Sequence, residues 1–409
     1  MVTDICIEDF DYELPAEKIA KYPLAGRDDS KLLVCTDATG YSPKEARFID
    51  IADFLPDKGL MVFNNTKVVP ARMVFTKETG SRVEVFCLEP DTPSDYQLCF
   101  SSTHKCRWKC IIGNLRRWKS GLLALNLDEG VTLTAELISH RDKDAVVEFA
   151  WNGPHTFSKI IEMAGRIPIP PYLNRDTEEI DITRYQTYYA LREGSVAAPT
   201  AGLHFTGKEL SDIDRRGLVR ENVCLHVGAG TFLPVKSRTI GGHTMHTEPF
   251  SVFRSLVKSL LKNGGNPVIS VGTTSTRCLE SLYFLGVHCI ENGIPDVVTQ
   301  WEPYREEGYP YSLKDSMEAL LSYMERENIN ELVSRTGIII VPGYKLRVCD
   351  YLVTNFHQPK STLLLLISAF IGDKWRENYR FALQNGFRFL SYGDSSLLQA
   401  RFRTNLEKD

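Results

Sequence analysis

The chain has 409 residues, of which 43% are apolar and 24% are charged, and this balance is typical of a globular protein with two or three domains. The net charge of −4 argues against a generally basic coat for nucleic acid, although it allows a local basic patch. No apolar run approaches the roughly 20 residues of a membrane span, and the acidic N-terminal stretch has no apolar signal core, so we expect a cytoplasmic protein that does not bind a membrane.

The first 150 residues change character in the middle. Residues 1–70 begin as an acidic, mixed segment and end in a strand-like run at 60–63, followed by the turn signal Asn64-Asn65. Residues 71–150 consist of short β-branched or aromatic segments, such as "RVEVFCLE" and "VTLTAELIS", separated by turn residues. Several short strands without a helical period predict a small all-β barrel or sandwich.

Helical patterns return after residue 151, and from about residue 219 short apolar strands alternate with amphipathic helices. The stretches "PVISVG" and "GIIIV" are typical of strands, whereas "TSTRCLESLYFLG" and "STLLLLISAFI" are typical of helices. This alternation predicts an α/β fold with a mainly parallel sheet, in which functional loops gather at the carboxyl ends of the strands. Residues 291–335 are polar and partly helical, and we interpret them as a peripheral connection.

Two loops carry glycine or hydroxyl groups directly after a predicted strand. In "CLHVGAGTFLPV" (224–235), Gly228 and Gly230 let a ligand approach the backbone, although a simple tight turn is the plainer explanation. In "VISVGTTSTRCLESL" (268–282), residues 273–276 open a helix, whose free N–H groups and positive dipole end suit a carboxylate or a phosphate. Ordinary N-capping by one hydroxyl is the alternative.

Two further loops carry histidine. The stretch "DYLVTNFHQPKSTLLLL" (350–366) places Asn355, His357 and Lys360 on one short loop, which favours a polar ligand there. The stretch "HTMHTE" (243–248) offers two histidines and a glutamate near one another. A catalytic zinc usually needs a third well-placed ligand on a helical or strand frame, so we expect no metal.

The segment "KCRWKCIIGNLRRWK" (105–119) is basic and aromatic, and it is the main candidate for RNA contact. Cations suit phosphates, and exposed aromatic rings can stack on unpaired bases. The alternative is a strand with a solvated basic face, in which Cys106, Trp108 and Cys110 point into the barrel core, opposite to Arg107 and Lys109. The predicted RNA-binding residues are Lys105, Arg107, Lys109, Arg116, Arg117, Trp118 and Lys119.

Eight stretches, spread from residue 9 to about residue 398, match a known family in its order. They are "DFDYELPAEKIAKYPLAGRDDSKLLV", "FNNTKVVPAR", "EGSVAAPTAGLHFT", "LHVGAGTF", "HTMHTE", "VGTTSTRCLESL", "PGYKLRVCDYLVTNFHQPKSTLLLLISAF" and "FLSYGDSSLL". On these motifs the chain resembles the S-adenosylmethionine:tRNA ribosyltransferase-isomerase family of queuosine biosynthesis.

The resemblance implies both a reaction and a fold. Members of the family transfer and isomerise the ribosyl unit of S-adenosylmethionine onto 7-aminomethyl-7-deazaguanine at the wobble position of a tRNA with a GUN-type anticodon, giving epoxyqueuosine, adenine and methionine. S-adenosylmethionine is then a substrate and tRNA a partner, and we expect a monomer or a weak homodimer. The implied fold is a three-layer α/β domain, residues 1–70 and 151–409, interrupted by an inserted all-β barrel domain, residues 71–150.

Three positions depart from the pattern of that family. Asn65 stands where aspartate is common, Lys67 where arginine is common, and Leu233 where arginine is common. Lysine keeps the positive charge but loses the bidentate geometry of arginine, and Leu233 removes a cation beside the glycine loop. These changes fit a divergent branch or a paralogue with an altered substrate.

A histidine with a pKa near neutrality can begin the implied reaction, because the sulfonium charge of the donor acidifies the neighbouring ribose C–H bond. His204, His226 and His357 are the candidate bases, and another histidine or Asp394 can protonate the departing adenine. The small side chains of "SVAAPTAGLHFT" (195–206) let a flat ligand approach the backbone, so we expect this stretch to form one wall of the site. The predicted donor-binding residues are Gly228, Gly230, Thr231, Phe232, Thr273, Thr274, Ser275, Arg277, Asn355, Lys360 and Tyr392.

Two other functions fit parts of the same sequence. A hydrolase that processes S-adenosylmethionine or another nucleoside would use the same α/β loops and release adenine without tRNA. A non-catalytic RNA-binding paralogue would use residues 105–119 and show no turnover.

Overall fold

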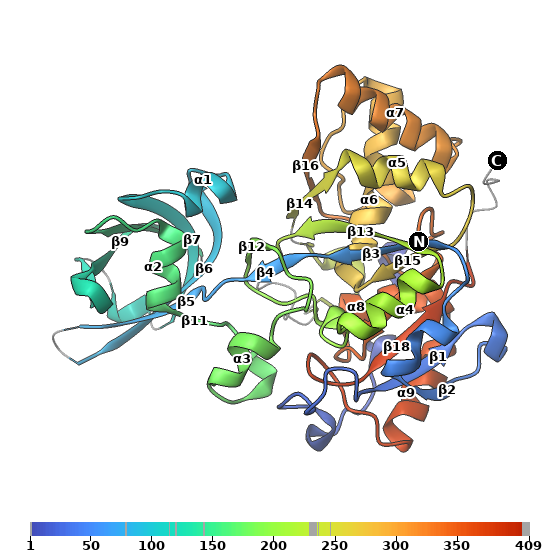
Figure 1. The fold of residues 1–409 in the computed structure, drawn as a ribbon, viewed down its shortest axis with the longest axis horizontal. Coiled ribbons are helices and arrows are strands. Elements are labelled where there is room, and N and C mark those ends of the chain that lie inside the picture. Colours follow the sequence, from blue (N-terminus) through green and yellow to red (C-terminus); the bar gives the residue numbers. More distant parts are fainter. Residues whose placement is uncertain are drawn as a thin grey trace.

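The computed structural model describes residues 2–77, 80–113, 115–118, 121–141, 144–228, 235, 237–245 and 247–402. Its largest feature is a nine-stranded mixed sheet that crosses the larger part of the molecule (Figure 1). In spatial order the strands are β16 (Glu331–Thr336), β14 (Glu248–Phe253), β13 (Leu218–Leu225), β3 (Gly59–Asn64), β15 (Val268–Val271), β17 (Tyr351–Asn355), β18 (Ser395–Gln399), β1 (Lys31–Cys35) and β2 (Lys44–Arg47).

This sheet is mixed, which corrects the expectation of a mainly parallel one. The central strands β13, β3, β15 and β17 run parallel to one another, and β18 pairs parallel with β1. The other pairs are antiparallel: β16 with β14, β14 with β13, β17 with β18, and β1 with β2. Antiparallel edge strands are common in α/β sheets. Strand β16 lies inside the segment 291–335, which the sequence predicted as a connection. The strand was not predicted because its polar face obscures the pattern of apolar residues. Residues 337–341 were predicted as a strand, but they are buried without forming one. A short apolar run indicates that residues are buried and does not show that they pair with another strand.

Both faces of the nine-stranded sheet are covered. Every residue of β3 is buried, so its side chains alternate between two apolar layers. Leu60 and Val62 pack on the side of helices α5 to α9, and Met61 and Phe63 pack on the side of α4 and the 3-10 helix Phe48–Phe54. The helices are α4 (Gly207–Arg215), α5 (Arg254–Lys262), α6 (Thr273–Asn292), α7 (Leu313–Arg326), α8 (Thr362–Ile371) and α9 (Lys374–Gln384).

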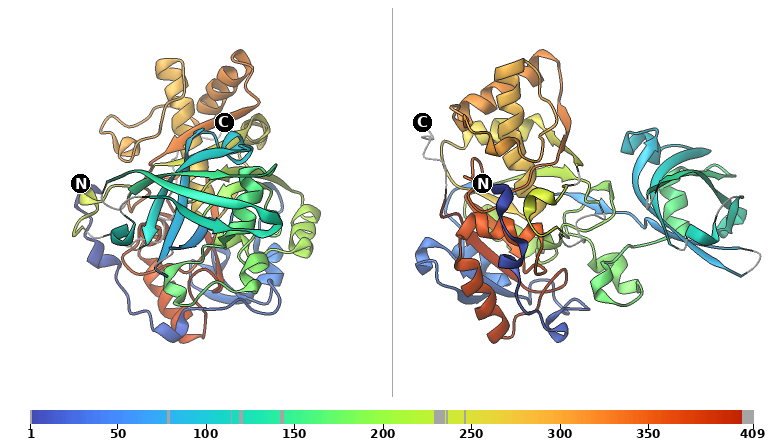
Figure 2. Two further views of the ribbon diagram at one scale, coloured as in Figure 1. Left: turned by 90° about the vertical axis from the view of Figure 1, so that its left-hand side faces the viewer. Right: turned by 180° about the vertical axis from the view of Figure 1, so that it is seen from behind.

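A second, antiparallel sheet of seven strands forms a separate lobe (Figure 2). It curls so that β8 approaches β5, and the helices α1 (Tyr96–Phe100) and α2 (Phe157–Ala164) pack against it. Helix α2 and strand β11 therefore belong to this lobe although they lie beyond residue 150. The strands in spatial order are β11 (Gly165–Arg166), β5 (Arg72–Thr76), β6 (Arg82–Thr92), β7 (Lys105–Gly113), β10 (Asp144–Trp151), β9 (Thr132–Arg141) and β8 (Leu123–Asn126).

Two extended segments connect the lobe to the rest of the molecule. Strand β4 (Thr66–Val68) leads into the lobe, and β12 (Arg192–Ser195) returns from it and pairs parallel with β4. The short helix α3 (Glu179–Arg184) lies on the returning segment, beside the connection (Figure 1). Because β4 follows β3 directly, the lobe is attached at the carboxyl end of a central strand.

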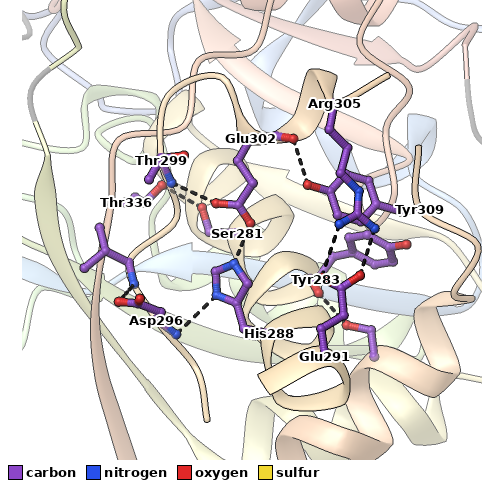
Figure 3. Close-up of polar contacts among 12 residues, drawn as sticks. Ser281, Tyr283, His288, Glu291, Asp296, Thr299, Glu302, Arg305, Tyr309 and Thr336 are labelled. Atoms are coloured by element: carbon purple, nitrogen blue, oxygen red, sulfur yellow. Dashed lines mark hydrogen bonds and ion pairs between the residues drawn. The ribbon is translucent and has the colours of Figure 1, made fainter. Parts of the chain in front are cut away.

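The polar segment after α6 is held onto that helix by side-chain contacts (Figure 3). His288 Nε2 lies 2.5 Å from Glu302 Oε1, and the second oxygen of Glu302 accepts the backbone N–H of Thr299 at 3.0 Å. Arg305 pairs with Glu291 and lies 3.7 Å from the ring centroid of Tyr309. We call the pair His288 and Glu302 the α6 clasp, since it fixes the connection that leads to α7.

Candidate active site

A cleft opens at the carboxyl ends of the parallel strands β15 and β17. This is where ligands bind in open α/β sheets. The residues around it come from the loops after these strands, from 197–201, and from the chain near 391. Its lining includes Tyr172, Ala197, Ala198, Pro199, Thr200, Ala201, Val227, Gly272, Thr273, Thr274, Thr354, Asn355, Phe356, His357, Gln358, Ser361, Leu390 and Ser391.

The small-residue stretch at 197–201 forms one wall of this cleft. Ser195 fixes the start of the wall, because its hydroxyl donates to the Ala197 carbonyl at 2.7 Å and accepts the Val227 N–H at 3.0 Å. The wall thus presents backbone and methyl groups rather than long side chains. His204 follows this stretch but lies behind the wall and does not line the cleft.

His204 is a buried, neutral link between two elements. Its Nδ1 lies 2.9 Å from Ser30 Oγ, and its Nε2 lies 3.2 Å from Asn355 Nδ2. Because Asn355 Nδ2 also donates to the Leu390 carbonyl, the Nε2 atom of His204 accepts and its Nδ1–H donates to Ser30. Burial, with the charge of Arg388, lowers the pKa of His204 to about 3, so the ring carries no charge at neutral pH.

Asn355 stands between His204 and the cleft. The residue is 2% exposed and lines the cleft, and its Oδ1 atom is buried without a hydrogen-bond partner among the described residues. A buried carbonyl oxygen without a donor is costly. Asn355 Oδ1 is therefore positioned to accept a hydrogen bond from an N–H or O–H group of a ligand.

His357 is the only one of the three predicted bases that lines the cleft. Its Nε2 lies 2.9 Å from Thr354 Oγ1, and its backbone N–H donates to the Tyr379 hydroxyl at 3.0 Å. Its carbonyl accepts a short hydrogen bond from the Tyr12 hydroxyl. Burial lowers the pKa of His357 to about 3, so the imidazole is neutral at neutral pH and is a weaker base than a free histidine.

The structure does not bring His226 together with the other two histidines. His226 stacks on Tyr96 with the ring centroids 4.2 Å apart, and its Nδ1 lies 3.1 Å from Thr66 Oγ1. It lines a different cleft, between β13, β14 and the antiparallel lobe. Burial and the charge of Arg192 lower its pKa to about 4.

The first turn of α6 contributes backbone rather than charged side chains to the cleft. Gly272 occupies the N-cap position with φ 91°, a conformation that suits glycine, and as glycine it has no side chain with which to cap the helix. Thr273 and Thr274 line the cleft, but Ser275 Oγ bonds back to the Val271 carbonyl at 2.7 Å. Arg277 is buried and forms an ion pair with Glu248.

Three other predicted residues are engaged away from the cleft. Lys360 Nζ lies 2.7 Å from Glu8 and 3.1 Å from Asp11. The Tyr392 hydroxyl donates to Asp181 Oδ1 at 2.7 Å. Both carboxylate oxygens of Asp394 accept backbone N–H groups, from Lys31 at 3.0 Å and Arg388 at 2.7 Å, so the structure assigns this aspartate a bond to the chain rather than to a ligand.

The glycine loop is described only at its start. The Gly228 N–H donates to Glu248 Oε1 at 3.3 Å. Gly230, Thr231, Phe232, Leu233 and His246 lie outside the described residues. Within the described ranges, no three His, Cys, Asp or Glu side chains are placed to hold one metal ion.

The basic segment forms strand β7 and the turn after it. Cys106, Trp108 and Cys110 are buried, as the parity predicted. The outward cations are paired with acids: Arg107 and Lys105 contact Glu148, and Lys109 contacts Glu89.

The turn after β7 also departs from the RNA-binding prediction. Trp118 is 0% exposed and donates its ring N–H to the Gly121 carbonyl at 2.9 Å, so the structure does not support a stacking role for its ring. Arg116 is exposed, and the Arg117 side chain and Lys119 lie outside the described residues.

Sequence reasoning missed Tyr172 and Ser391, which both line the cleft. Their hydroxyl oxygens share a short hydrogen bond that joins segments more than 200 residues apart. Ser391 lies in the motif "FLSYGDSSLL", so its place in a family motif could have indicated a functional role. Tyr172 follows two prolines, and no sequence feature marked it as part of the site. Of the departures from the family pattern, Lys67 pairs with Glu193 at 2.9 Å, and Asn65 is buried at the end of β3.

Comparisons with known proteins point to one family. The family model described as "Queuosine biosynthesis protein" matches residues 7–398. The S-adenosylmethionine:tRNA ribosyltransferase-isomerase of Halothermothrix orenii is 38% identical over 397 residues, covering 96% of this chain and 99% of that protein. The protein of the same name from Trichlorobacter lovleyi is 36% identical over 400 residues, covering 96% and 99%.

A crystal structure of S-adenosylmethionine tRNA ribosyltransferase from Thermotoga maritima is 27% identical, covers 95% of this chain and 99% of that one, and has a TM-score of 0.46. No helix within the described ranges combines the length and apolar character needed to cross a membrane. Since the family model spans most of the sequence and the relatives match along nearly their whole length, the chain belongs to the family of queuosine biosynthesis proteins.

Proposed function

We propose that this chain transfers and isomerises the ribosyl unit of S-adenosylmethionine onto 7-aminomethyl-7-deazaguanine at the wobble position of tRNA, giving epoxyqueuosine. The amine nitrogen of the base loses one proton to solvent and bonds to a ribosyl carbon, and the C–N bond to adenine and the C–S bond to methionine break. In the isomerisation a ribosyl C–H bond and the ring C–O bond break, and a C–C bond and the second C–O bond of the epoxide form, so that the C–H proton balances the one that adenine takes up. Adenine keeps the electron pair of its C–N bond and takes up a proton. Methionine leaves as a neutral thioether with the electron pair of the C–S bond.

The cleft at the carboxyl ends of β15 and β17 carries this proposal. Its walls are the small-residue stretch at 197–201, the first turn of α6 and the loop that bears His357. These loops belong to the motifs on which the chain resembles the family.

Within the cleft we assign proton transfer to His357, which is neutral and has a ring nitrogen that bonds to no described residue. Asn355 Oδ1 would accept a hydrogen bond from the amino group or a hydroxyl group of the donor, and His204 would position Asn355. The N–H groups of the first turn of α6, beside Thr273 and Thr274, suit the carboxylate of methionine.

We further propose the organisation and partners that the resemblance implies. The chain would act as a three-layer α/β domain with an inserted β domain, in the cytoplasm, as a monomer or weak homodimer. Its partners would be S-adenosylmethionine and a tRNA with a GUN-type anticodon, and no metal would take part.

The test is incubation with ribosyl-labelled S-adenosylmethionine and tRNA that carries the aminomethyl-deazaguanine base. We expect label on the tRNA and release of one adenine per transfer, and a loss of about 100-fold or more in rate for His357→Ala. The matched control is His226→Gln, which changes a histidine outside the cleft and should keep the rate within about twofold. Adenine release without tRNA would identify a hydrolase instead, and RNA binding without turnover would identify a binding paralogue.

A further inference from the structure

A small second pocket lies against the back of the cleft and is lined by three arginines. It is narrow and partly open to solvent, and it is formed by residues near 23–30, the end of α3, residues 203–204 and the chain after α9. The arginines are Arg27, Arg184 and Arg388. Ser391 lines both this pocket and the cleft, and His204, which also lines the pocket, contacts the cleft residue Asn355. The two cavities therefore share a wall.

Among the residues that the structure describes, the guanidinium groups of this pocket bond only to backbone carbonyls. Arg27 donates to the carbonyls of Leu203 at 3.0 Å and Thr183 at 2.7 Å, and Arg184 donates to the Ala25 carbonyl at 3.0 Å. Arg388 donates to Tyr392 at 2.8 Å and to Tyr22 at 3.2 Å. Each guanidinium has five N–H donors, so each keeps several for a ligand, and the Nε–H of Arg184 is buried without a partner among the described residues.

The acids near the pocket bond to other groups within the described ranges, although the charge of Asp394 acts on Arg388. Within the described ranges, none of the three arginines forms an ion pair with a carboxylate at 4.0 Å or less. Asp181, on α3, is taken up by Arg175 at 2.7 Å, and Asp394 by two backbone N–H groups. Burial and then the charge of Arg184 lower the pKa of Arg27, and burial lowers the pKa of Arg388, against the opposing charge of Asp394.

We propose that this pocket binds a phosphate of the tRNA backbone next to the nucleotide that enters the cleft. A tetrahedral phosphodiester offers oxygens in several directions to the three arginines that line the pocket, whereas a carboxylate is satisfied by one bidentate arginine. Because the two cavities share a wall, the bound phosphate would lie beside the reacting base. The pocket would then hold the wobble nucleotide in position relative to the cleft. This inference rests on the proposed function, because it takes the anion from tRNA; the carboxylate of the donor has the same charge and is separated by the test below.

The test compares Arg184→Gln with wild type, because Arg184 has the fewest bonds to the backbone. A glutamine amide still can donate to the Ala25 carbonyl but carries no charge. We expect the Kd for an unmodified tRNA transcript, measured by fluorescence anisotropy, to rise about tenfold at 0.1 M KCl. The slope of log Kd against log KCl concentration should fall by about 0.7–0.9, the value of one phosphate contact. The KM for S-adenosylmethionine should stay within about twofold.

The matched control is Arg326→Gln, which removes an exposed arginine from α7. If Arg184→Gln binds tRNA with the Kd and slope of that control, the inference is wrong. A raised KM for S-adenosylmethionine with unchanged tRNA binding would assign the pocket to the donor carboxylate and overturn it as well.

A charge-conserving variant guards against a folding defect. If the circular dichroism spectrum of Arg184→Gln differs from that of wild type, Arg388→Lys takes its place. This variant should keep the slope of log Kd against log KCl concentration but raise the tRNA Kd several-fold, since lysine lacks the guanidinium fork. An unchanged Kd would reject the phosphate site. Because anisotropy needs no turnover, failure of the proposed function appears separately, as a wild-type protein that binds tRNA but transfers no label.

Discussion

The contact between His204 and Asn355 decides how the histidine in the small-residue motif acts. In the sequence, His204 ends a loop that lines the cleft, and this makes it a natural candidate for a base. In the structure both ring nitrogens are occupied, by Ser30 and Asn355, and the ring packs 4.9 Å from that of Phe48. A ring that is buried and bonded on both sides can hold Asn355 in place but has no free nitrogen for a proton from substrate.

At the same scale, His204→Gln should therefore act through Asn355. We expect the folded protein and the KM for S-adenosylmethionine to change little, and kcat to fall about 10- to 100-fold, because a displaced Asn355 misplaces the donor. Steady-state kinetics with labelled donor measure both constants. Ser30→Ala, which removes only the outer contact of the ring, should cost less. A kcat equal to wild type would show that the orientation of Asn355 does not matter.

At the level of elements, α6 does two different things along its length. Its first turn borders the cleft, and its buried middle carries Glu280, whose carboxylate accepts the Tyr344 hydroxyl and three backbone N–H groups of the 347–349 stretch. Its last turns carry the α6 clasp, which fixes the connection to α7. Gln300, in that connection, bonds both the His243 carbonyl and the Met245 N–H. The polar segment at 291–335 is thus a scaffold for the loop that contains "HTMHTE".

Breaking the α6 clasp should loosen that scaffold without touching the cleft. Glu302→Ala removes the partner of His288 and of the Thr299 N–H, so we expect the free energy of unfolding to fall by about 1–3 kcal/mol. Urea unfolding measures this loss, and hydrogen exchange should rise within 293–305. Glu291→Ala breaks a more exposed pair with Arg305 and should cost less than about 1 kcal/mol. Equal losses in the two variants would contradict a special role for the clasp.

At the level of the whole molecule, three neutral histidines make stability depend on pH. Burial lowers the pKa of His204 and His357 to about 3 and that of His226 to about 4, whereas each has a pKa near 6.5 in an unfolded chain. Below about pH 6.5 the unfolded chain therefore binds protons that the folded chain does not. The stabilising effect is complete above that pH and is lost as the pH falls toward 3–4.

We expect the free energy of unfolding, measured in urea, to decrease from pH 7.5 to pH 5 by up to about 1.4 kcal/mol per pH unit for each histidine. A His204→Gln variant should show a smaller slope over the same range, because it removes one of the three titrating groups. If the slope of that variant equals that of wild type, His204 does not titrate on unfolding as proposed.

The sequence by itself was sufficient for what depends on local pattern and on motif. The family, the α/β alternation, the β-rich insert and the burial of Cys106, Trp108 and Cys110 all follow from periodicity or from uninterrupted motif stretches. The loops at 197–201, 273–274 and 355–357 were also predicted to border one site, because loops after parallel strands meet at one edge of a sheet.

Only the tertiary structure decided which of the predicted side chains face that site. His226, Arg277, Lys360, Tyr392 and Asp394 carry the right chemistry, but each is bonded to a partner distant in the sequence and lies outside the cleft. In the sequence, Trp118 is a candidate for stacking on an RNA base, but in the structure its ring is buried in the curled sheet. The three arginines of the second pocket come from segments that are far apart in the sequence, and no single motif contains them all. The physical reason is the same throughout: a side chain's direction and its competing partners are set by long-range packing, which a one-dimensional pattern does not contain.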